Sequence, residues 1–98
     1  MAIIHGNEQS FKEEIKDELV IVDFFATWCG PCRMLGPVLE EISDKYKIVK
    51  IDVDECPNIS RDYGVMSVPT IIKFKNGEEI NKNIGFLPKE ELIKWIEE

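Results

Sequence analysis

The chain has 98 residues, of which 44% are hydrophobic, and it carries a formal net charge of -7. This length predicts one small domain, residues 1–98, with a single core. The acidic balance argues against partners such as nucleic acid or an anionic membrane, because such partners select clustered Lys and Arg. No stretch approaches the roughly 20 apolar residues of a membrane span, and the amino terminus does not resemble a signal peptide. We therefore expect a cytoplasmic protein, and we expect it to be a monomer.

The first third of the chain predicts a strand, a helix and a second strand. Residues 2–5 are a candidate short strand, and Asn7 can cap a helix that runs to about Asp17, with Phe11 and Ile15 on its inner face. Residues 19–26 then form a nearly unbroken apolar run. Such a run is typical of a strand buried on both faces.

The middle of the chain predicts a long helix, a third strand and a short helix. The long helix is indicated by apolar residues at spacings of three and four, which are Leu35, Val38, Leu39, Ile42 and Tyr46. Residues 48–54 alternate like a strand, with Lys50 and Asp52 on the polar face. Pro57 can begin a short helix that ends near Gly64, a natural left-handed stop.

The last third predicts a hairpin and a final helix. Residues 70–74 are rich in strand formers and lead to Asn76-Gly77, a strong hairpin signal. A helix beginning near Pro88 would bury Leu92, Ile93 and Ile96. The order is βαβαβ followed by ββα. It predicts an α/β fold in which parallel strands joined by helices are extended by an antiparallel edge.

Between the second strand and the long helix lies Trp28-Cys29-Gly30-Pro31-Cys32. A CxxC pair can close and open a small disulfide ring, and the start of a helix favours a thiolate. Zinc binding would need two more ligands, and only Cys56 and His5 remain. A purely structural disulfide would gain little from so short a loop. The motif beside a βαβ pattern therefore indicates a redox-active disulfide with no metal or other bound cofactor.

The whole chain resembles the thioredoxin family in the order and spacing of its motifs. The matching residues are Asp23, Trp28-Cys29-Gly30-Pro31-Cys32, Pro37, Lys50, Val68-Pro69-Thr70, Lys75-Asn76-Gly77 and Gly85. Two positions depart from the pattern: Phe25 stands where many bacterial members carry a tryptophan, and Cys56 is not a family feature. The resemblance implies a mixed central sheet flanked by helices on both faces, with the active site at the carboxyl end of the catalytic strand.

The two cysteines are expected to divide the work of disulfide reduction. Cys29 is nearer the helix start and should be the more exposed, so we expect it to attack the client disulfide. Cys32 lies one turn in and should resolve the mixed disulfide. Thioredoxins carry the same assignment. Gly30 and Pro31 tune the redox potential, and because they add no charge or donor that would stabilise a thiolate, they favour a reductase over an isomerase or oxidant.

Asp23 is unusual because it lies in a strand predicted to be buried. Its carboxyl group must be protonated there or have compensating partners. One interpretation is a core aspartate with dedicated hydrogen bonds. The other is a group that takes the proton from Cys32 through water when that thiol attacks the mixed disulfide. Lys50, on the neighbouring strand, either modulates Asp23 or is simply solvated.

A client-binding surface is also expected near the motif. The resemblance implies that the Val68-Pro69 bond is cis and faces the CxxC, leaving the Val68 backbone free to pair with an extended client. The alternative is a trans proline at the start of a strand. Further apolar contacts would come from Trp28, Ile84, Gly85 and Phe86, although core packing explains Trp28 equally well.

These predictions favour a protein-disulfide reductase that works by dithiol-disulfide exchange. Nothing in the sequence suits a flavin or nicotinamide, so a separate reductase, by resemblance thioredoxin reductase, would return it to the dithiol form. The alternatives are a disulfide isomerase or oxidant, and a non-catalytic subunit that uses the fold for binding. Cys56 has acidic neighbours that disfavour its thiolate, and we interpret it as a bystander and not as a regulatory thiol.

Overall fold

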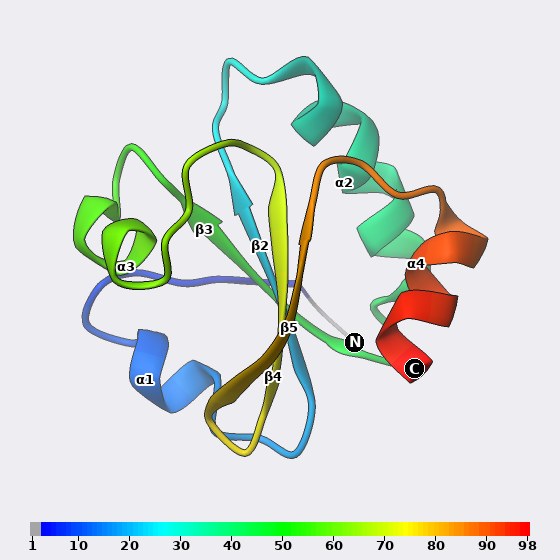
Figure 1. Ribbon diagram of the computed structural model, residues 1–98, viewed down its shortest axis with the longest axis horizontal. Helices are drawn as coiled ribbons and strands as arrows, with labels where there is room; N and C mark the ends of the chain where they lie inside the picture. The colour runs from blue at the N-terminus through cyan, green and yellow to red at the C-terminus, as the bar shows by residue number, and fades with distance from the viewer. Residues whose placement is uncertain (1–2) are drawn as a thin grey trace.

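A computed structural model describes residues 3–98 as a five-stranded mixed sheet with helices on both faces (Figure 1). The strands are β1 (Ile3–His5), β2 (Val20–Phe25), β3 (Lys47–Asp52), β4 (Thr70–Lys75) and β5 (Glu78–Ile84). Their spatial order is β1-β3-β2-β4-β5. The first three strands are parallel, whereas β4 and β5 pair antiparallel to their neighbours. The expected architecture is confirmed; Ala2, assigned to the first strand, lies outside the described residues.

Two helices cover each face of the sheet. They are α1 (Phe11–Glu14), α2 (Gly30–Ile42), α3 (Pro57–Asp62) and α4 (Lys89–Glu97). One core lies between the sheet and α1 with α3, and a second lies between the sheet and α2 with α4. No helix within residues 3–98 has the length and apolar character that a membrane crossing requires.

Strand β2 lies in the centre of the sheet, and its side chains contribute to both cores. Val20, Val22 and Phe24 are part of the first core, and Ile21 is part of the second. Since side chains alternate along a strand, the two remaining odd-numbered positions of β2, Asp23 and Phe25, share the face of Ile21. The strand therefore directs a carboxyl group toward the side covered by α2, the helix that carries the CxxC pair.

Two predicted helices are shorter than expected. Asn7 does not cap α1: its Oδ1 accepts hydrogen bonds from the backbone N–H groups of Gln9 and Ser10, both at 2.9 Å, and so holds a turn before the helix. Helix α2 ends at Ile42. Ser43 follows and donates to the Glu40 carbonyl at 2.9 Å, a local bond that competes with helix continuation, so Tyr46 lies in the next turn.

The predicted turns are confirmed. Asn76 and Gly77 have φ values of 52° and 88°, as a two-residue hairpin between β4 and β5 requires. Gly64, after α3, has a φ of 67°. This left-handed position ends the helix where the sequence placed its stop.

Lys73 is a buried charge within β4 that the sequence analysis did not single out. Its Nζ donates to the carbonyl oxygens of Trp95 at 2.9 Å and Ile96 at 3.1 Å, so it binds the end of α4. We expect Lys73→Met to lower the free energy of unfolding by about 1–3 kcal/mol, because these carbonyls lose a charged donor. Denaturant titration measures this loss. Lys75→Met, an exposed change on the same strand, is the control and should stay within about 0.5 kcal/mol; equal effects at the two positions would contradict the capping role.

Candidate active site

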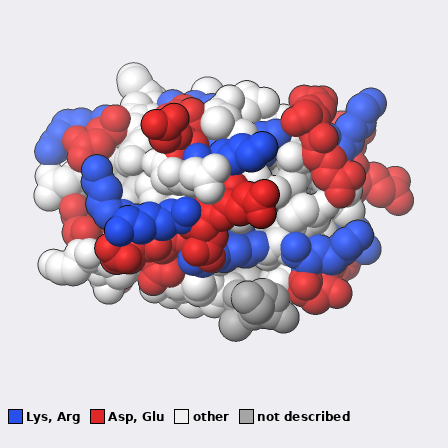
Figure 2. Space-filling model, turned by 90° about the horizontal axis from the view of Figure 1, so that it is seen from below, with Lys and Arg blue, Asp and Glu red and all other residues white. Residues whose placement is uncertain are grey.

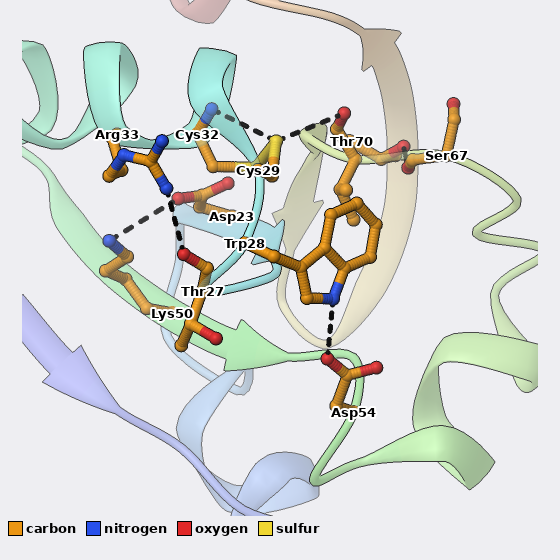
Figure 3. Close-up of a disulfide and its surroundings, with 11 residues drawn as sticks. Asp23, Thr27, Trp28, Cys29, Cys32, Arg33, Lys50, Asp54, Ser67 and Thr70 are labelled. Atoms are coloured by element: carbon orange, nitrogen blue, oxygen red, sulfur yellow. Dashed lines mark hydrogen bonds and ion pairs between the residues drawn. A yellow bond between two sulfur atoms is a disulfide. The ribbon is translucent and has the colours of Figure 1, made fainter.

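The CxxC pair lies where β2 passes into α2. Cys29 is the residue that caps α2, with an extended backbone, and Pro31 occupies the first turn, where its missing N–H costs no helical bond. Cys29 and Cys32 are joined by a disulfide, with their Cα atoms 5.3 Å apart (Figure 3). Gly30 is half-buried and Pro31 is exposed. The two intervening residues thus form the solvent side of a ring at the helix start.

The expected difference in exposure between the two cysteines is not observed. Cys29 is 5% exposed and Cys32 is 4% exposed, because the disulfide ring packs against Ala26 and neighbouring apolar side chains. A hydrogen bond distinguishes them instead. The Sγ of Cys29 accepts from the backbone N–H of Cys32 at 3.2 Å. A thiolate at Cys29 would be stabilised by this donor and by the helix N-terminus, whereas Cys32 is itself within the helix.

The loop before β4 lies against the disulfide. The bond between Val68 and Pro69 is cis, Pro69 is buried, and the Val68 carbonyl oxygen lies 3.6 Å from the Sγ of Cys29. The end of β5 supports this loop, because the N–H of Gly85 donates to the Pro69 carbonyl at 2.8 Å. The Val68 backbone therefore lies beside the disulfide, and Gly85 is tied to the adjacent Pro69.

A groove lies beside the same loop. It is lined by Trp28, Val53, Val65, Met66, Ser67 and Val68. The ring of Trp28 is 68% exposed and its Nε1 donates to Asp54 at 3.0 Å, so it is a wall of this groove and not part of the core (Figure 3). Met66 is 93% exposed. Met66 and Val53 were not predicted from the sequence, in which the one signal for Met66 is that residues 65–67 directly precede the Val68-Pro69 pair.

The remaining predicted contact residues lie at the end of β5. Ile84 is 68% exposed, so its side chain is available to a partner. Phe86 is half-buried and packs against the core formed with α2 and α4. Of the apolar side chains expected at this surface, Trp28 and Ile84 are largely exposed, whereas Phe86 packs partly against the core.

Asp23 is fully buried near this junction. Its Oδ2 lies 3.9 Å from the Nζ of Lys50, its direct partner in the pairing of β2 with β3. Within residues 3–98, neither carboxylate oxygen has a hydrogen-bond partner. Burial raises the pKa of Asp23 from its ordinary value to about 7, and the charge of Lys50 partly opposes this rise. The interpretation of Asp23 as a core aspartate with dedicated hydrogen bonds is therefore wrong.

A second groove gives this side of the disulfide access to solvent. Its lining includes Phe25, Cys32, Arg33 and Lys50. The Nζ of Lys50 lies 4.5 Å from the centroid of the Phe25 ring, and Arg33 donates to the carbonyl of Thr27 at 3.1 Å. Lys50 is thus neither fully solvated nor fully buried. It lines the same groove as Cys32, and its ammonium lies beside the carboxyl group of Asp23.

The comparisons with known proteins agree with this geometry. The family model described as Thioredoxin matches residues 2–98. The chain belongs to the thioredoxin family. It is 51% identical to a thioredoxin of Bacillus subtilis, over 98% of this chain and 96% of that protein, and 48% identical to one of Staphylococcus saprophyticus, over 99% and 97%. Among solved structures, a mutant thioredoxin from Halobacterium salinarum superposes with a TM-score of 0.91 at 32% identity, covering 99% of this chain and 93% of that one.

The thioredoxin relationship and the Cys29-Cys32 disulfide together establish the activity. The chain is a thiol-disulfide oxidoreductase that reduces protein disulfides through a redox-active cysteine pair. In general terms, its partners are a thioredoxin reductase and disulfide-containing clients. Within residues 3–98, no three His, Cys, Asp or Glu side chains meet in a way that could hold a metal ion.

Cys56, the third cysteine, lies outside this site. It is buried, it precedes α3, and no disulfide includes it. Burial is the largest cause that raises the pKa of the Cys56 thiol, and the charges of Glu8, Glu55 and Asp52 raise it further. Of these two causes, only the acidic neighbours were predicted from the sequence. A buried thiol with a raised pKa is a poor nucleophile, which supports its interpretation as a bystander.

Proposed function

We propose that Cys29 is the attacking thiolate and Cys32 the resolving thiol of this reductase. The observation that supports this order is the 3.2 Å hydrogen bond from the Cys32 N–H to the Cys29 sulfur, since it stabilises negative charge on Cys29 alone. The Cys29 thiolate attacks one client sulfur, the client disulfide breaks, and the second client sulfur leaves and takes a proton. Cys32 then attacks Cys29, which releases the first client sulfur as a thiol and leaves the Cys29-Cys32 disulfide.

In the second step, Asp23 accepts the proton that Cys32 loses. A pKa of about 7 allows its carboxylate to gain and release a proton near neutral pH. Transfer runs through water admitted by the groove that Cys32 and Lys50 share. Lys50 modulates the reaction, because its charge favours the ionised form of Asp23.

Clients bind across the loop before β4. The exposed Trp28 and Ile84, together with Val68, Gly85 and the accessible part of Phe86, offer an apolar contact surface, and an extended client segment pairs with the Val68 backbone. Pro69 holds that backbone beside Cys29. Client selection then depends on an extended, largely apolar segment that flanks the disulfide.

The chain is further proposed to act as one domain over residues 1–98, as a monomer in the cytoplasm, without bound cofactor, metal, nucleic acid or membrane. On the face shown in Figure 2, Lys and Arg side chains lie among Asp and Glu side chains and do not form a wide basic patch. Such a surface offers little to a polyanion. Electrons arrive from a separate reductase, through exchange at the same cysteine pair.

The redox potential of the Cys29-Cys32 pair tests whether Gly30 and Pro31 set this potential at a reducing value. We expect a potential near the roughly -270 mV known for thioredoxin, and we expect Pro31→His to move it toward the roughly -180 mV of protein disulfide isomerase, because a histidine stabilises the Cys29 thiolate. Equilibration with glutathione measures both values. Glu40→His, at the exposed far end of α2, is the control and should leave the potential unchanged. A Pro31→His variant with the parent potential would refute the tuning.

A further inference from the structure

The Lys50 ammonium is held in an unusual way. Its distance of 3.9 Å from Asp23 Oδ2 is too long for a hydrogen bond, and neither carboxylate oxygen of Asp23 has a hydrogen-bond partner within residues 3–98. An unanchored lysine beside a groove would extend its ammonium into water. The ammonium also lies over the ring of Phe25, 4.5 Å from the ring centroid. The ring therefore helps to fix the position of the Lys50 ammonium.

Strand register explains how Phe25 reaches Lys50. Asp23 is paired with Lys50, and Phe25 follows two residues later on the same face of β2. The lysine side chain crosses toward both neighbours, so its ammonium lies near a carboxylate and over an aromatic ring at once. A cation within about 6 Å of a ring centroid is attracted by the negative face of the ring.

We propose that Phe25 is a positioning residue that holds the Lys50 ammonium against Asp23 and thereby sets how readily Asp23 accepts the proton of Cys32. The proposal rests on the proposed function of Asp23. Phe25 packs beside the cluster that contains Cys29 and Cys32, but its proposed effect on Asp23 is exerted through Lys50.

The other charged groups near Asp23 are accounted for. On α2, Arg33 lines the groove with Cys32, and its guanidinium binds the Thr27 carbonyl. On β3, Asp52 accepts from the N–H of Asp54 at 2.9 Å. On β4, the ammonium of Lys73 is bound at the end of α4. Lys50 is thus the charge whose position most directly controls Asp23.

The test compares Phe25→Leu with Phe25→Tyr. Leucine removes the ring and lets Lys50 move into water, so the pKa of Asp23 should rise by about 0.5 to 1. Tyrosine keeps the ring and should leave that pKa within about 0.2 of the parent value. Carboxyl NMR titration of the oxidised protein measures it directly. A role in packing alone predicts the opposite sign, because a smaller side chain admits water and lowers the pKa of a buried carboxyl group.

The decisive control is the same change in a Lys50→Met background. If Phe25 acts through Lys50, then Phe25→Leu leaves the pKa of Asp23 unchanged once the ammonium is gone. A rise that persists in Lys50→Met, or a fall in either background, would overturn the proposal. The pH profile of mixed-disulfide resolution, measured in single turnovers, should shift with the titration. If the titration shifts and the profile does not, the contact between Phe25 and Lys50 stands, and the proton-acceptor role of Asp23 is wrong.

Discussion

A Cys32→Ser variant should accumulate a covalent complex with its clients through Cys29, whereas Cys29→Ser should reduce a model protein disulfide no faster than the uncatalysed reaction. Resolution needs a second thiol adjacent to the mixed disulfide. Cys32 is the residue placed to supply it, because it forms the disulfide with Cys29. Serine has the same shape as cysteine, but its hydroxyl cannot form a disulfide. Non-reducing electrophoresis followed by mass spectrometry identifies the complex and the residue that forms it.

Cys56→Ser is the matched control for this experiment. Cys56 is buried, as Cys29 and Cys32 are, and burial and acidic neighbours raise its pKa, so its loss should leave the reduction rate unchanged. In the Cys32→Ser background, Cys56→Ser should trap the same complexes. Normal turnover by Cys32→Ser, or trapping through Cys56, would show that the assignment of roles to Cys29 and Cys32 is wrong.

The exposed fractions of Cys29 and Cys32 could not be predicted from the sequence. The position of a CxxC pair at a strand-to-helix junction follows from periodicity alone, and the structure confirms it. Relative exposure depends on how the loop before β4 covers the ring, which involves Val68 and Pro69, about 40 positions away along the chain. A local pattern does not contain such a contact. The hydrogen bond that separates the two sulfurs follows from the capping geometry of Cys29.

For the helices, too, the buried faces could be predicted from the sequence, whereas the ends could not. Apolar spacing located the buried faces of α2 and α4 correctly, because the hydrophobic effect acts on every residue of a stripe. It overestimated the length of α1 and α2, because the local hydrogen bonds that Asn7 accepts and the one that Ser43 donates decide where a turn replaces a helix. Lys73 was missed for a related reason: a lysine in an apolar strand is tolerated only because distant carbonyls of α4 receive it.

The unusual environment of Asp23, in contrast, was predicted from its place in an apolar strand. The raised pKa of this buried carboxyl group has a large effect on stability. The folded-state pKa of about 7 lies above the unfolded value near 3.9. Between these two pKa values the unfolded state binds fewer protons than the folded state, so the free energy of unfolding falls as pH rises from about 4 to 7 and is level above that range. Three pKa units correspond to about 4 kcal/mol.

Asp23→Asn should therefore abolish most of this pH dependence. Relative to the parent protein, the variant should gain about 4 kcal/mol more stability at pH 9 than at pH 4, because the amide never ionises. Taking the difference between the two pH values cancels the cost of burying the amide itself, which is the same at both. Denaturant titrations at a series of pH values measure the curve, and single-turnover kinetics should show slower resolution of the mixed disulfide.

Asp17→Asn provides the matched control, since Asp17 is an exposed carboxylate that forms a surface ion pair with Lys47 at 3.1 Å. Its removal should change stability by less than about 1 kcal/mol at either pH, because solvent screens exposed pairs. If Asp23→Asn and the parent protein had parallel stability curves from pH 4 to 9, Asp23 would have to be solvated or well paired in solution. The pKa of Asp23 would then lie near its ordinary value, so its carboxylate would be too weak a base to take the proton of Cys32 readily near neutral pH, and Cys32 would need a different proton acceptor.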